Sequence, residues 1–275
     1  MKLKVDFAAV VSWFLRYLLL FLWFVVILIP IIWIFLSAFK PLDEVLKFSI
    51  PSRIQIENFI IPYTTRPYPT YYLNSILFAT FSTISVLFFC SLAGYGFAKF
   101  RFFGRKVFFF MVLSTLMISV HVTMVPLFRI IQSLGMVDTL PGLLAPFMMT
   151  GVGVFLMRQF MIAIPDDYID AARIDGAGEI LIFARIIIPL AIPIVSALGV
   201  INFIAIWDEF LWPLVIGLSK KRTMTVGLAL FVTGFKSPLN QLFAVSVTAV
   251  VPMMMAYFFA QRHFVRSLAL TGLKE

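Results

Sequence analysis

Residues 17–39 read YLLLFLWFVVILIPIIWIFLSAF, an apolar run without a charged side chain. A helix needs about twenty apolar residues to cross the hydrocarbon layer of a bilayer, so this run is long enough to span it. It is longer than the apolar core of a secretory signal and lacks a small-residue cleavage site, so we expect a retained first span. These residues therefore predict a helical membrane protein.

Five further segments have the length and composition of a span. The full set of predicted spans is 17–39, 73–98, 107–132, 142–162, 190–218 and 242–260. With 62% apolar residues, 13% charged residues and a mean hydropathy of +1.03, the chain lacks the polar surface that a soluble domain needs. We predict an all-α integral membrane protein with about six transmembrane helices, in which residues 1–275 form a single transmembrane domain.

The net charge of +9 could suggest nucleic acid, but Lys and Arg stand singly or in short clusters between long apolar runs. This pattern suits anchoring to anionic lipid at a membrane surface. An even number of spans places both termini on one side, and the positive-inside rule favours the cytoplasm. We therefore expect a multi-pass membrane protein with both termini in the cytoplasm, and with the lipid bilayer and not nucleic acid as its partner.

No residue pattern in the chain indicates catalysis or a bound metal. Cys90 is the only cysteine and lies in an apolar run, so we expect a small buried hydrophobe. His121 and His263 stand alone, without metal-ligand spacing to other Cys, His or acidic residues. We predict no metal site and no catalytic residue on this chain.

The longest polar connection near the start covers residues 40–72 and contains five prolines with tyrosines between them. Proline restricts the backbone, so we expect a stiff and mostly extended loop. Two interpretations carry equal weight: a plain connector, or a docking surface for an extracytoplasmic partner.

The loop between the fourth and fifth spans, residues 163–189, holds five of the 13 acidic residues of the chain. Residues 165–189 read PDDYIDAARIDGAGEILIFARIIIP. Proline followed by Asp166 or Asp167 predicts a helix start, because a carboxylate caps free amides and offsets the helix dipole. Gly176 predicts the end of that helix in a left-handed conformation.

A second helix is expected to start near Gly178 and to run to Pro189. Ala171 and Ala172 would let another surface approach the first helix closely. An interfacial amphipathic helix is the plain alternative, but acidic residues beside anionic headgroups fit it poorly. We therefore predict a protein partner for this loop.

The same loop resembles the EAA loop of ABC-importer permeases. The family pattern is E-A-A-x-x-D-G-A, a phenylalanine six residues later and two prolines four apart. The matching residues are Asp170, Ala171, Ala172, Asp175, Gly176, Ala177, Phe183, Pro189 and Pro193. The one departure is Asp170, where the family usually has Glu, and the charge is kept.

Other segments are similar to the maltose-type branch of that family. They are Asn74-Ser75, residues 92–99 with 103–105, and residues 134–142, 207–214 and 261–266. The resemblance thus covers most of the chain. It implies a sugar substrate, or the glycerol phosphate that some members of the branch import.

What the resemblance implies is one permease subunit of an importer with several parts. A second permease, usually unlike the first, would complete the pathway, and a solute-binding protein would deliver substrate outside. A cytoplasmic ATPase dimer would hold ATP and Mg, because this chain has no Gly-x-x-x-x-Gly-Lys-Ser/Thr loop. The loop residues from Asp170 to Ala177, with Phe183, would form the cytoplasmic coupling helix that sits in an ATPase cleft and transmits its closure as alternating access.

Asp208 and Glu209 are charged residues inside the predicted fifth span. Unpaired charge in lipid is costly, so we expect them to face a cavity, a neighbouring subunit or the outer interface. Trp207 and Trp212 favour the interface, and lining of the pathway or a substrate contact is the alternative. Asn202 could add a hydrogen bond to a sugar, although polar bonds between helices are commoner.

Three other classes of membrane protein compete with the importer. A secondary carrier would show internal repeats and several intramembrane ionisable groups, and neither pattern is evident. An ion channel would need a filter-like loop, and a membrane enzyme would need a nucleophile, a metal cluster or paired acids. Dependence of uptake on ATP rather than on an ion gradient would separate the importer from the secondary carrier.

Overall fold

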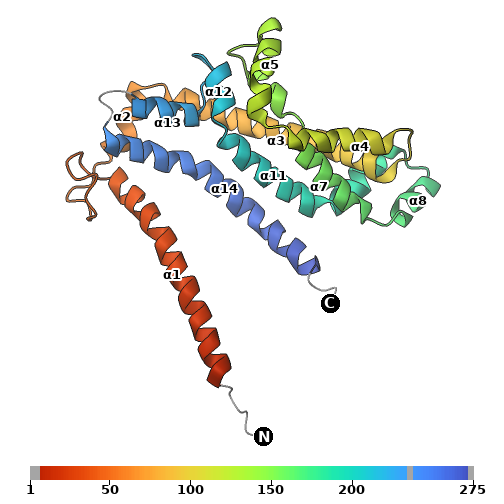
Figure 1. Ribbon diagram of the computed structural model, residues 1–275, viewed down its shortest axis with the longest axis horizontal. Coiled ribbons are helices and arrows are strands. Elements are labelled where there is room, and N and C mark those ends of the chain that lie inside the picture. The colour runs from red at the N-terminus through yellow and green to blue at the C-terminus, as the bar shows by residue number, and fades with distance from the viewer. Residues whose placement is uncertain (1–6, 234–237, 272–275) are drawn as a thin grey trace. The chain divides into compact units, whose positions relative to one another are not determined.

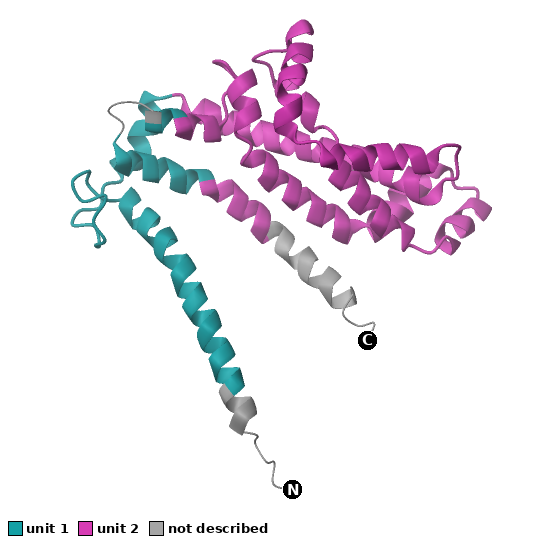
Figure 2. Ribbon diagram, viewed as in Figure 1, with its two compact units in different colours: residues 1–66, 230–249 teal, residues 67–229, 250–275 magenta. Residues whose placement is uncertain are grey.

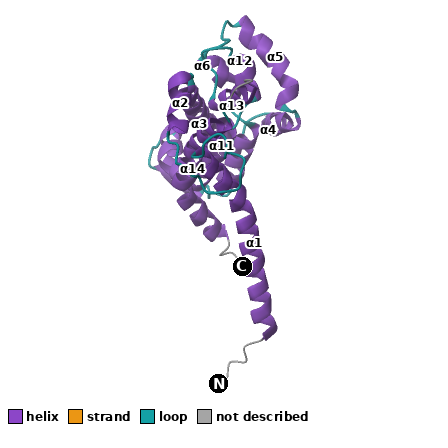
Figure 3. Ribbon diagram, turned by 90° about the vertical axis from the view of Figure 1, so that its left-hand side faces the viewer, coloured by secondary structure: helices purple, strands orange, loops and turns teal. Residues whose placement is uncertain are grey.

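The computed structural model describes residues 7–233 and 238–271, with the side chains of residues 12–232 and 238–258. Over these ranges the chain is helical and contains no strand, as Figure 3 shows. Three helical segments are long and apolar enough to cross a membrane, and three bent pairs of helices raise the number to as many as six. The predicted class of all-α membrane protein is confirmed.

The helices follow one another as shown in Figure 1. They are α1 (Phe7–Ala38), α2 (Glu57–Thr65), α3 (Tyr68–Lys99), α4 (Arg105–Ser114), α5 (Val120–Ser133), α6 (Leu140–Leu144), α7 (Gly151–Ile162), α8 (Asp167–Ile174), α9 (Glu179–Ile182), α10 (Ile188–Leu190), α11 (Ile192–Trp207), α12 (Leu211–Ile216), α13 (Met224–Thr233) and α14 (Leu239–Thr271). A π-helical stretch, Phe183–Ile187, joins α9 to α10.

Two of the predicted spans are interrupted by short polar residues. The helices on either side of Ser119 meet at 104°, and those on either side of Thr150 meet at 48°. The hydroxyl of Ser119 accepts from the His121 N–H (3.4 Å), and that of Thr150 accepts from the Gly153 N–H (3.0 Å). Each hydroxyl caps a new helix, so the straight helix expected over 107–132 is instead broken.

A third bend lies at the start of the fifth predicted span, residues 190–218. The helical segments Glu179–Leu190, from the predicted inner loop, and Ile192–Trp207 meet there at 78°. The break falls at Ala191, between Pro189 and Pro193. Pro193 lacks the N–H that would continue the first helix, but it fits the first turn of the next one.

The loop at residues 40–72 differs from the prediction. Residues 57–65 form α2, and α3 begins at Tyr68, earlier than expected. Pro69 sits in the first turn of α3, where a missing N–H has no cost. The expectation of a mostly extended loop is therefore wrong, because Pro67 and Pro69 stand at the start of α3, where proline is tolerated, and α2 contains Pro62 within its helix.

The chain separates into two compact units (Figure 2). Unit 1 comprises residues 1–66 and 230–249, and unit 2 comprises residues 67–229 and 250–275. Within unit 1, α1 is highly apolar and the 18-residue window that best fits a span is unburied, which suits a helix covered by lipid or by another subunit.

Unit 1 is held together by buried amides at the end of α1. The Asn58 side chain donates to the carbonyls of Ala38 (2.9 Å) and Lys40 (3.0 Å). Asn240 donates in turn to the Asn58 side-chain oxygen (2.9 Å). The fully buried Lys40 ammonium donates to the Lys47 carbonyl (2.7 Å), so the polar groups of this region are satisfied by the chain itself.

Unit 2 is built around α3, which packs against α7 and α11. A Cβ on Gly94 would lie 2.5 Å from the Met157 Cβ, and one on Gly153 would lie 2.7 Å from the Cys90 sulfur. Small residues therefore allow α3 and α7 to approach closely, as in many membrane helix pairs. Cys90 is fully buried here, which confirms its predicted place in the core.

Candidate functional site

The loop after α7 folds as a short helix, a tight turn and a second helix. Gly176, just beyond α8, has a φ of 82°. Its N–H donates to the Arg173 carbonyl (3.0 Å), and the Ala177 N–H donates to the Ala172 carbonyl (2.9 Å). These two bonds form a Schellman motif, which satisfies carbonyls at the helix end and requires a positive φ. The predicted left-handed turn at Gly176 is confirmed, and the second helix begins directly after Gly178 as expected.

The start of α8 lies where it was predicted, but it is held in another way. No side chain caps the free amides of its first turn. The Asp166 carboxylate instead accepts from the Lys99 ammonium (2.6 Å), which also donates to the Ile164 carbonyl (2.5 Å). The Lys99 side chain is 5% exposed, and a buried cation needs such partners. The predicted carboxylate cap is therefore wrong, and Asp166 connects α8 to the end of α3.

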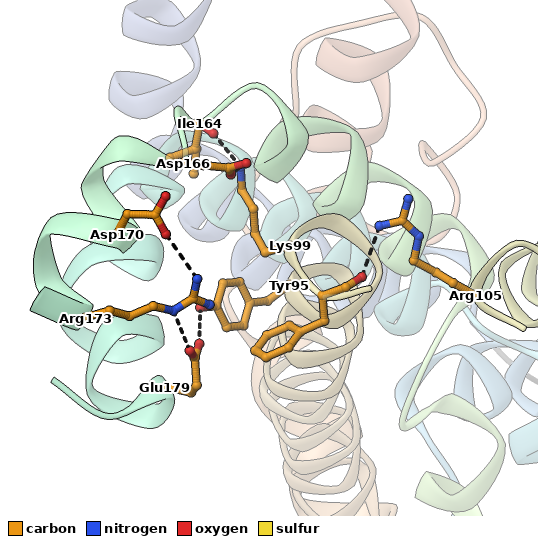
Figure 4. Close-up of polar contacts among 9 residues, drawn as sticks. Tyr95, Lys99, Arg105, Ile164, Asp166, Asp170, Arg173 and Glu179 are labelled. Carbon is orange, nitrogen blue, oxygen red and sulfur yellow. Dashed lines mark hydrogen bonds and ion pairs between the residues drawn. The ribbon is translucent and has the colours of Figure 1, made fainter. Parts of the chain in front are cut away.

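A second set of polar contacts joins the two helices of the loop (Figure 4). Arg173 donates to Glu179 (2.8 Å) and to Asp170 (3.2 Å). The Tyr95 hydroxyl, from α3, donates to the other oxygen of Glu179 (2.9 Å). The hydrogen bond from Arg173 is the main cause that lowers the pKa of Glu179, and the bond from Lys99 likewise lowers the pKa of Asp166. Both carboxylates are charged at neutral pH.

One face of the loop is anchored in the core of unit 2. Ile169 is 2% exposed and belongs to a buried cluster with side chains of α3 and α7. Ala172, Ala177 and Phe183 pack against the same cluster, and the Phe183 and Tyr95 rings lie 5.5 Å apart. Ala172, which we expected to admit a partner surface, thus packs against its own chain. These residues fix the position of the loop.

The opposite face of α8 is exposed. The exposed residues among those predicted for coupling are Asp170 and Ala171 on α8, and Asp175 and Gly176 directly after it. Ile174 and Ile180 are each 85% exposed, although both are large and apolar. Ile174 lies five residues after Ile169, about 140° round the helix, so this angle could have identified it as an outward residue. A hollow of about 620 Å³ lies beside Ile180.

Sequence reasoning missed the two α3 residues, Tyr95 and Lys99, that hold the loop in place. Their distance from it in the sequence gave no signal of the contact. In the resulting arrangement, ion pairs and apolar contacts hold one side of α8 against unit 2. The opposite side, called the exposed front below, presents acidic residues and the exposed apolar side chain of Ile174. Such a surface is suited to contact with another protein.

Asp208 and Glu209 are not inside a helix as predicted, because α11 ends at Trp207 and α12 begins at Leu211. Glu209 accepts from the Trp212 N–H (3.1 Å) near the start of α12, and its carbonyl accepts from the Thr225 hydroxyl (3.0 Å). Asp208 is exposed. A break in the helix lets the chain hold one carboxylate with a backbone bond and leave the other outside the core.

Trp207 and Trp212 are 3% and 1% exposed. The Trp212 indole N–H donates to the Gly142 carbonyl (3.2 Å), and Trp207 packs against Tyr72 and Phe203. Both tryptophans are therefore buried inside unit 2 and pack against their own chain.

Asn202, on α11, is buried, and its side chain donates to the Thr83 hydroxyl of α3 (3.2 Å). This contact is the bond between helices that was the alternative to a sugar contact. A single interhelical bond of this kind contributes about 0.6 kcal/mol in a membrane.

The chain also matches known proteins over most of its length. Residues 87–270 match the family described as the binding-protein-dependent transport system inner membrane component. The chain belongs to this family. The matched range contains the whole loop with its Schellman turn, so the permease is the membrane part of an ABC importer rather than its catalytic part.

Relatives of this permease include named subunits from several bacteria. The arabinooligosaccharides transport system permease protein AraQ of Bacillus subtilis is 33% identical over 254 residues, which cover 90% of each chain. The diacetylchitobiose uptake system permease protein NgcG of Streptomyces coelicolor is 31% identical over 258 residues, covering 91% of this permease and 85% of NgcG. The sn-glycerol-3-phosphate transport system permease protein UgpE of Agrobacterium fabrum is 36% identical over 201 residues, covering 72% and 71%.

Solved structures share the fold of this permease. One is a bacterial ABC transporter involved in the import of the acidic polysaccharide alginate, with a TM-score of 0.87 at 23% identity, covering 96% of this permease and 100% of that chain. A second is the alginate ABC transporter in complex with an alginate pentasaccharide-bound periplasmic protein, with a TM-score of 0.67 at 17% identity. At these identities the similarity concerns the fold alone.

Proposed function

We propose that this permease is one of two unlike membrane subunits of a bacterial importer for a carbohydrate. It works with a cytoplasmic ATPase dimer, which binds ATP and Mg, and with a solute-binding protein on the outer side. Both of its termini face the cytoplasm. The observation that carries the proposal is the rigid helix–turn–helix with an exposed front, inside the range that matches the family.

A sugar or oligosaccharide is the substrate class that the relatives support best. AraQ and NgcG belong, by name, to oligosaccharide systems and match 90% or more of this permease. The relative named for glycerol 3-phosphate matches 72% of it. A neutral sugar is bound by hydrogen bonds and apolar contacts, and we assign no single contact to Asn202, Asp208 or Glu209.

The exposed front of α8 is proposed to enter a cleft of the ATPase. Asp170 and Asp175 supply charge for polar contacts, and Ala171 and Gly176 keep the surface low enough for close approach. Ile174 supplies an apolar anchor of the kind that interfaces bury at their centre. Ala172, Ala177 and Phe183 then have the supporting role of holding this surface against the core.

The supporting contacts give a route by which movement of the ATPase reaches the membrane helices. A push on α8 acts on Lys99 and Tyr95 of α3 through Asp166 and Glu179. It also acts on the packed core through Ile169. Because a packed core moves as a body rather than bending continuously, displacement of α8 tilts helices and so alternates access to the pathway.

The cytoplasmic position of α8 is also supported by charge. Lys99, Arg101, Arg105 and Lys106 follow one another closely at the end of α3, which contacts the loop. An excess of basic residues beside spans is typical of the cytoplasmic side. With an even number of spans, both termini then lie on that same side.

The test is to tag the permease, extract it gently from its native membrane and identify what is recovered with it. We expect an ATPase subunit and a second permease in amounts comparable to the tagged chain. Recovery of the chain alone, or of a homo-oligomer without an ATPase, would refute the proposal. Uptake that survives ATP depletion but stops when ion gradients collapse would point to a secondary carrier.

A further inference from the structure

Two adjoining cavities lie beside the turn between α3 and α4. Their volumes are about 340 Å³ and about 170 Å³, and both are lined by Arg105 and Lys106. Arg101 lines the larger cavity and Arg158, from α7, lines the smaller one. No acidic residue lines either cavity, so four positive charges converge on one place.

The two arginines of the smaller cavity are held in position by the end of α3. Arg105 donates to the Phe100 carbonyl (3.0 Å), and Arg158 donates to the Phe97 carbonyl (3.3 Å). The Arg158 guanidinium also lies 4.1 Å from the centre of the Phe109 ring. A guanidinium has five N–H donors, so each of these arginines keeps four for another partner.

The described part of the chain provides no carboxylate for these charges. Its ion pairs involve Lys99 and Arg173 as cations and none of the four cavity residues. The Arg101 charge contributes to the lowered pKa of Asp166, but the Asp166 carboxylate already forms an ion pair with Lys99. Several fixed guanidinium donors without a carboxylate are a suitable site for a phosphate group, which arginine binds through two parallel bonds.

The remaining lining of the cavities is apolar and open to the surroundings. Phe102, Val107 and Phe110 are 45%, 58% and 70% exposed. Val107 and Phe110 belong to α4, the first half of a bent pair that has the composition of a membrane span. A phosphate site that continues into an exposed apolar helix face lies at the boundary of the bilayer, where a lipid headgroup meets its acyl chains.

We propose that these cavities bind an anionic phospholipid, with its phosphate between Arg105 and Arg158 and an acyl chain along Val107 and Phe110. Basic pockets between membrane helices on the cytoplasmic side have this recognition chemistry. Assignment of the lipid to the inner leaflet rests on the cytoplasmic position proposed for α8. The site joins α3, α4 and α7 next to the Lys99–Asp166 contact, so a bound lipid would stabilise the support of the loop.

The experiment is native mass spectrometry of the detergent-purified intact transporter, titrated with cardiolipin, phosphatidylglycerol or phosphatidylcholine. We expect the anionic lipids to bind more tightly than phosphatidylcholine. The double variant Arg105→Gln/Arg158→Gln should weaken anionic-lipid binding by about tenfold or more, because it removes charge-assisted bonds. Arg185→Gln removes an exposed arginine from the same end of unit 2 that lines neither cavity, and it should bind lipid as the unchanged protein does.

Further variants and a competitor make the result decisive. Lys106→Gln alters an exposed residue without a described partner, so it tests the site even if the double variant fails to assemble, and it should weaken binding severalfold. Phe110→Ser should weaken lipid binding as well. Equal binding of all three lipids, or binding by Lys106→Gln equal to that of Arg185→Gln, would overturn the proposal. Displacement of the lipid by millimolar inorganic phosphate, with no effect of Phe110→Ser, would show a site for free phosphate and overturn it too.

Discussion

Unit 2 contains two tight turns of similar backbone shape that are held in different ways. In the inner loop Gly176 has a φ of 82°, and in the turn after α5 Gly135 has a φ of 67°. A Cβ on either glycine would meet no atom within 4 Å. Local conformation therefore does not distinguish the two turns, and the difference lies in what surrounds them.

The turn after α5 is held by hydrogen bonds between a carboxylate and backbone amides of another loop of the same chain. Asp138, with a φ of 56°, accepts from the amides of Ser219 (3.4 Å), Lys220 (3.1 Å) and Lys221 (3.0 Å), and from the Ser219 hydroxyl (2.9 Å). One carboxylate thus fixes two loops to each other. Its hydrogen-bonding capacity is fully used.

The inner loop is instead held by side-chain pairs on one face only. Lys99, Tyr95 and Arg173 engage carboxylates on the side toward α3, whereas Ile174 on the other side is exposed. The inner loop is thus held in position by contacts on its α3-facing side, while its opposite side stays exposed to solvent or to a partner. If this difference separates a coupling element from a structural one, equivalent changes in the two turns should affect transport differently.

The largest expected effect comes from Gly176→Trp. The added ring projects into the space proposed for the ATPase, so uptake should fall by at least about tenfold, as for obstruction at the centre of an interface. Radiolabelled sugar uptake and co-purification of the ATPase are the measurements. Insertion into the membrane should be unaffected.

The matched control is Gly135→Trp. It carries the same penalty for a side chain at positive φ and also meets open space, but it lies in the other turn. It should keep near-normal uptake and ATPase recovery. Equal loss of uptake in both variants would mean that strain in the turns, and not access of a partner, limits transport.

The second prediction concerns the carboxylate of Asp138. Asp138→Ala leaves three amides without their acceptor, so unfolding should be easier by about 1–3 kcal/mol, with faster hydrogen exchange in residues 217–223. Asp138→Asn keeps one acceptor oxygen and tolerates positive φ, so it should lose less than half as much. Thermal unfolding in detergent measures both, and equal losses would contradict the proposed role of the carboxylate.

A smaller effect is expected from Arg173→Gln, which removes the bridge between α8 and α9. Exposed pairs contribute little, so amide exchange in residues 167–182 should rise by only about two- to fivefold. Exchange in residues 217–223 should not change. Arg185→Gln, which breaks no described pair, is the control, and an equal rise in that variant would argue against the bridge.

The smallest expected effect is a pH dependence of the inner loop. The pKa values of Asp166 and Glu179 are lowered by their cationic partners. The stability that these two charged carboxylates give the folded loop is therefore fully present above their ordinary pKa values of about 3.9 and 4.3. It is lost as the pH falls through the lowered folded-state values. Exchange in residues 167–182, corrected for intrinsic rates, should be constant from about pH 7 to about pH 5 and rise only below about pH 4. A rise already near pH 6 would contradict this assignment.

Much of the inner loop could be predicted from local sequence. Pro165 and the acidic residues after it mark a helix start, and Gly176 marks a stop, because both signals depend on the conformations of a few adjacent residues. The partner of Asp166 could not be predicted in this way. Lys99 is 67 residues away, and only the packing of α3 against α7 brings it near.

The membrane spans, like the inner loop, were predicted only in part from local sequence. Apolar length predicted where helices occur, but the bend at Ser119 depends on which polar side chain finds a free amide. The burial of Trp207 and Trp212 likewise depends on neighbours supplied by α3 and α6. A buried tryptophan needs a partner for its indole N–H, and only the packed structure brings the Gly142 carbonyl to Trp212.

The sequence by itself determined that this protein is helical, lies in a membrane and carries the loop of an importer permease. The first two properties follow from apolar length and from short-range backbone preferences, which each segment has independently of the rest. The third follows from the resemblance of adjacent residues to a family motif. The tertiary structure decided which face of the loop is exposed, which cations hold it and where basic residues converge at the end of α3. These features depend on contacts between residues far apart in the chain, and such contacts exist only once the helices have packed.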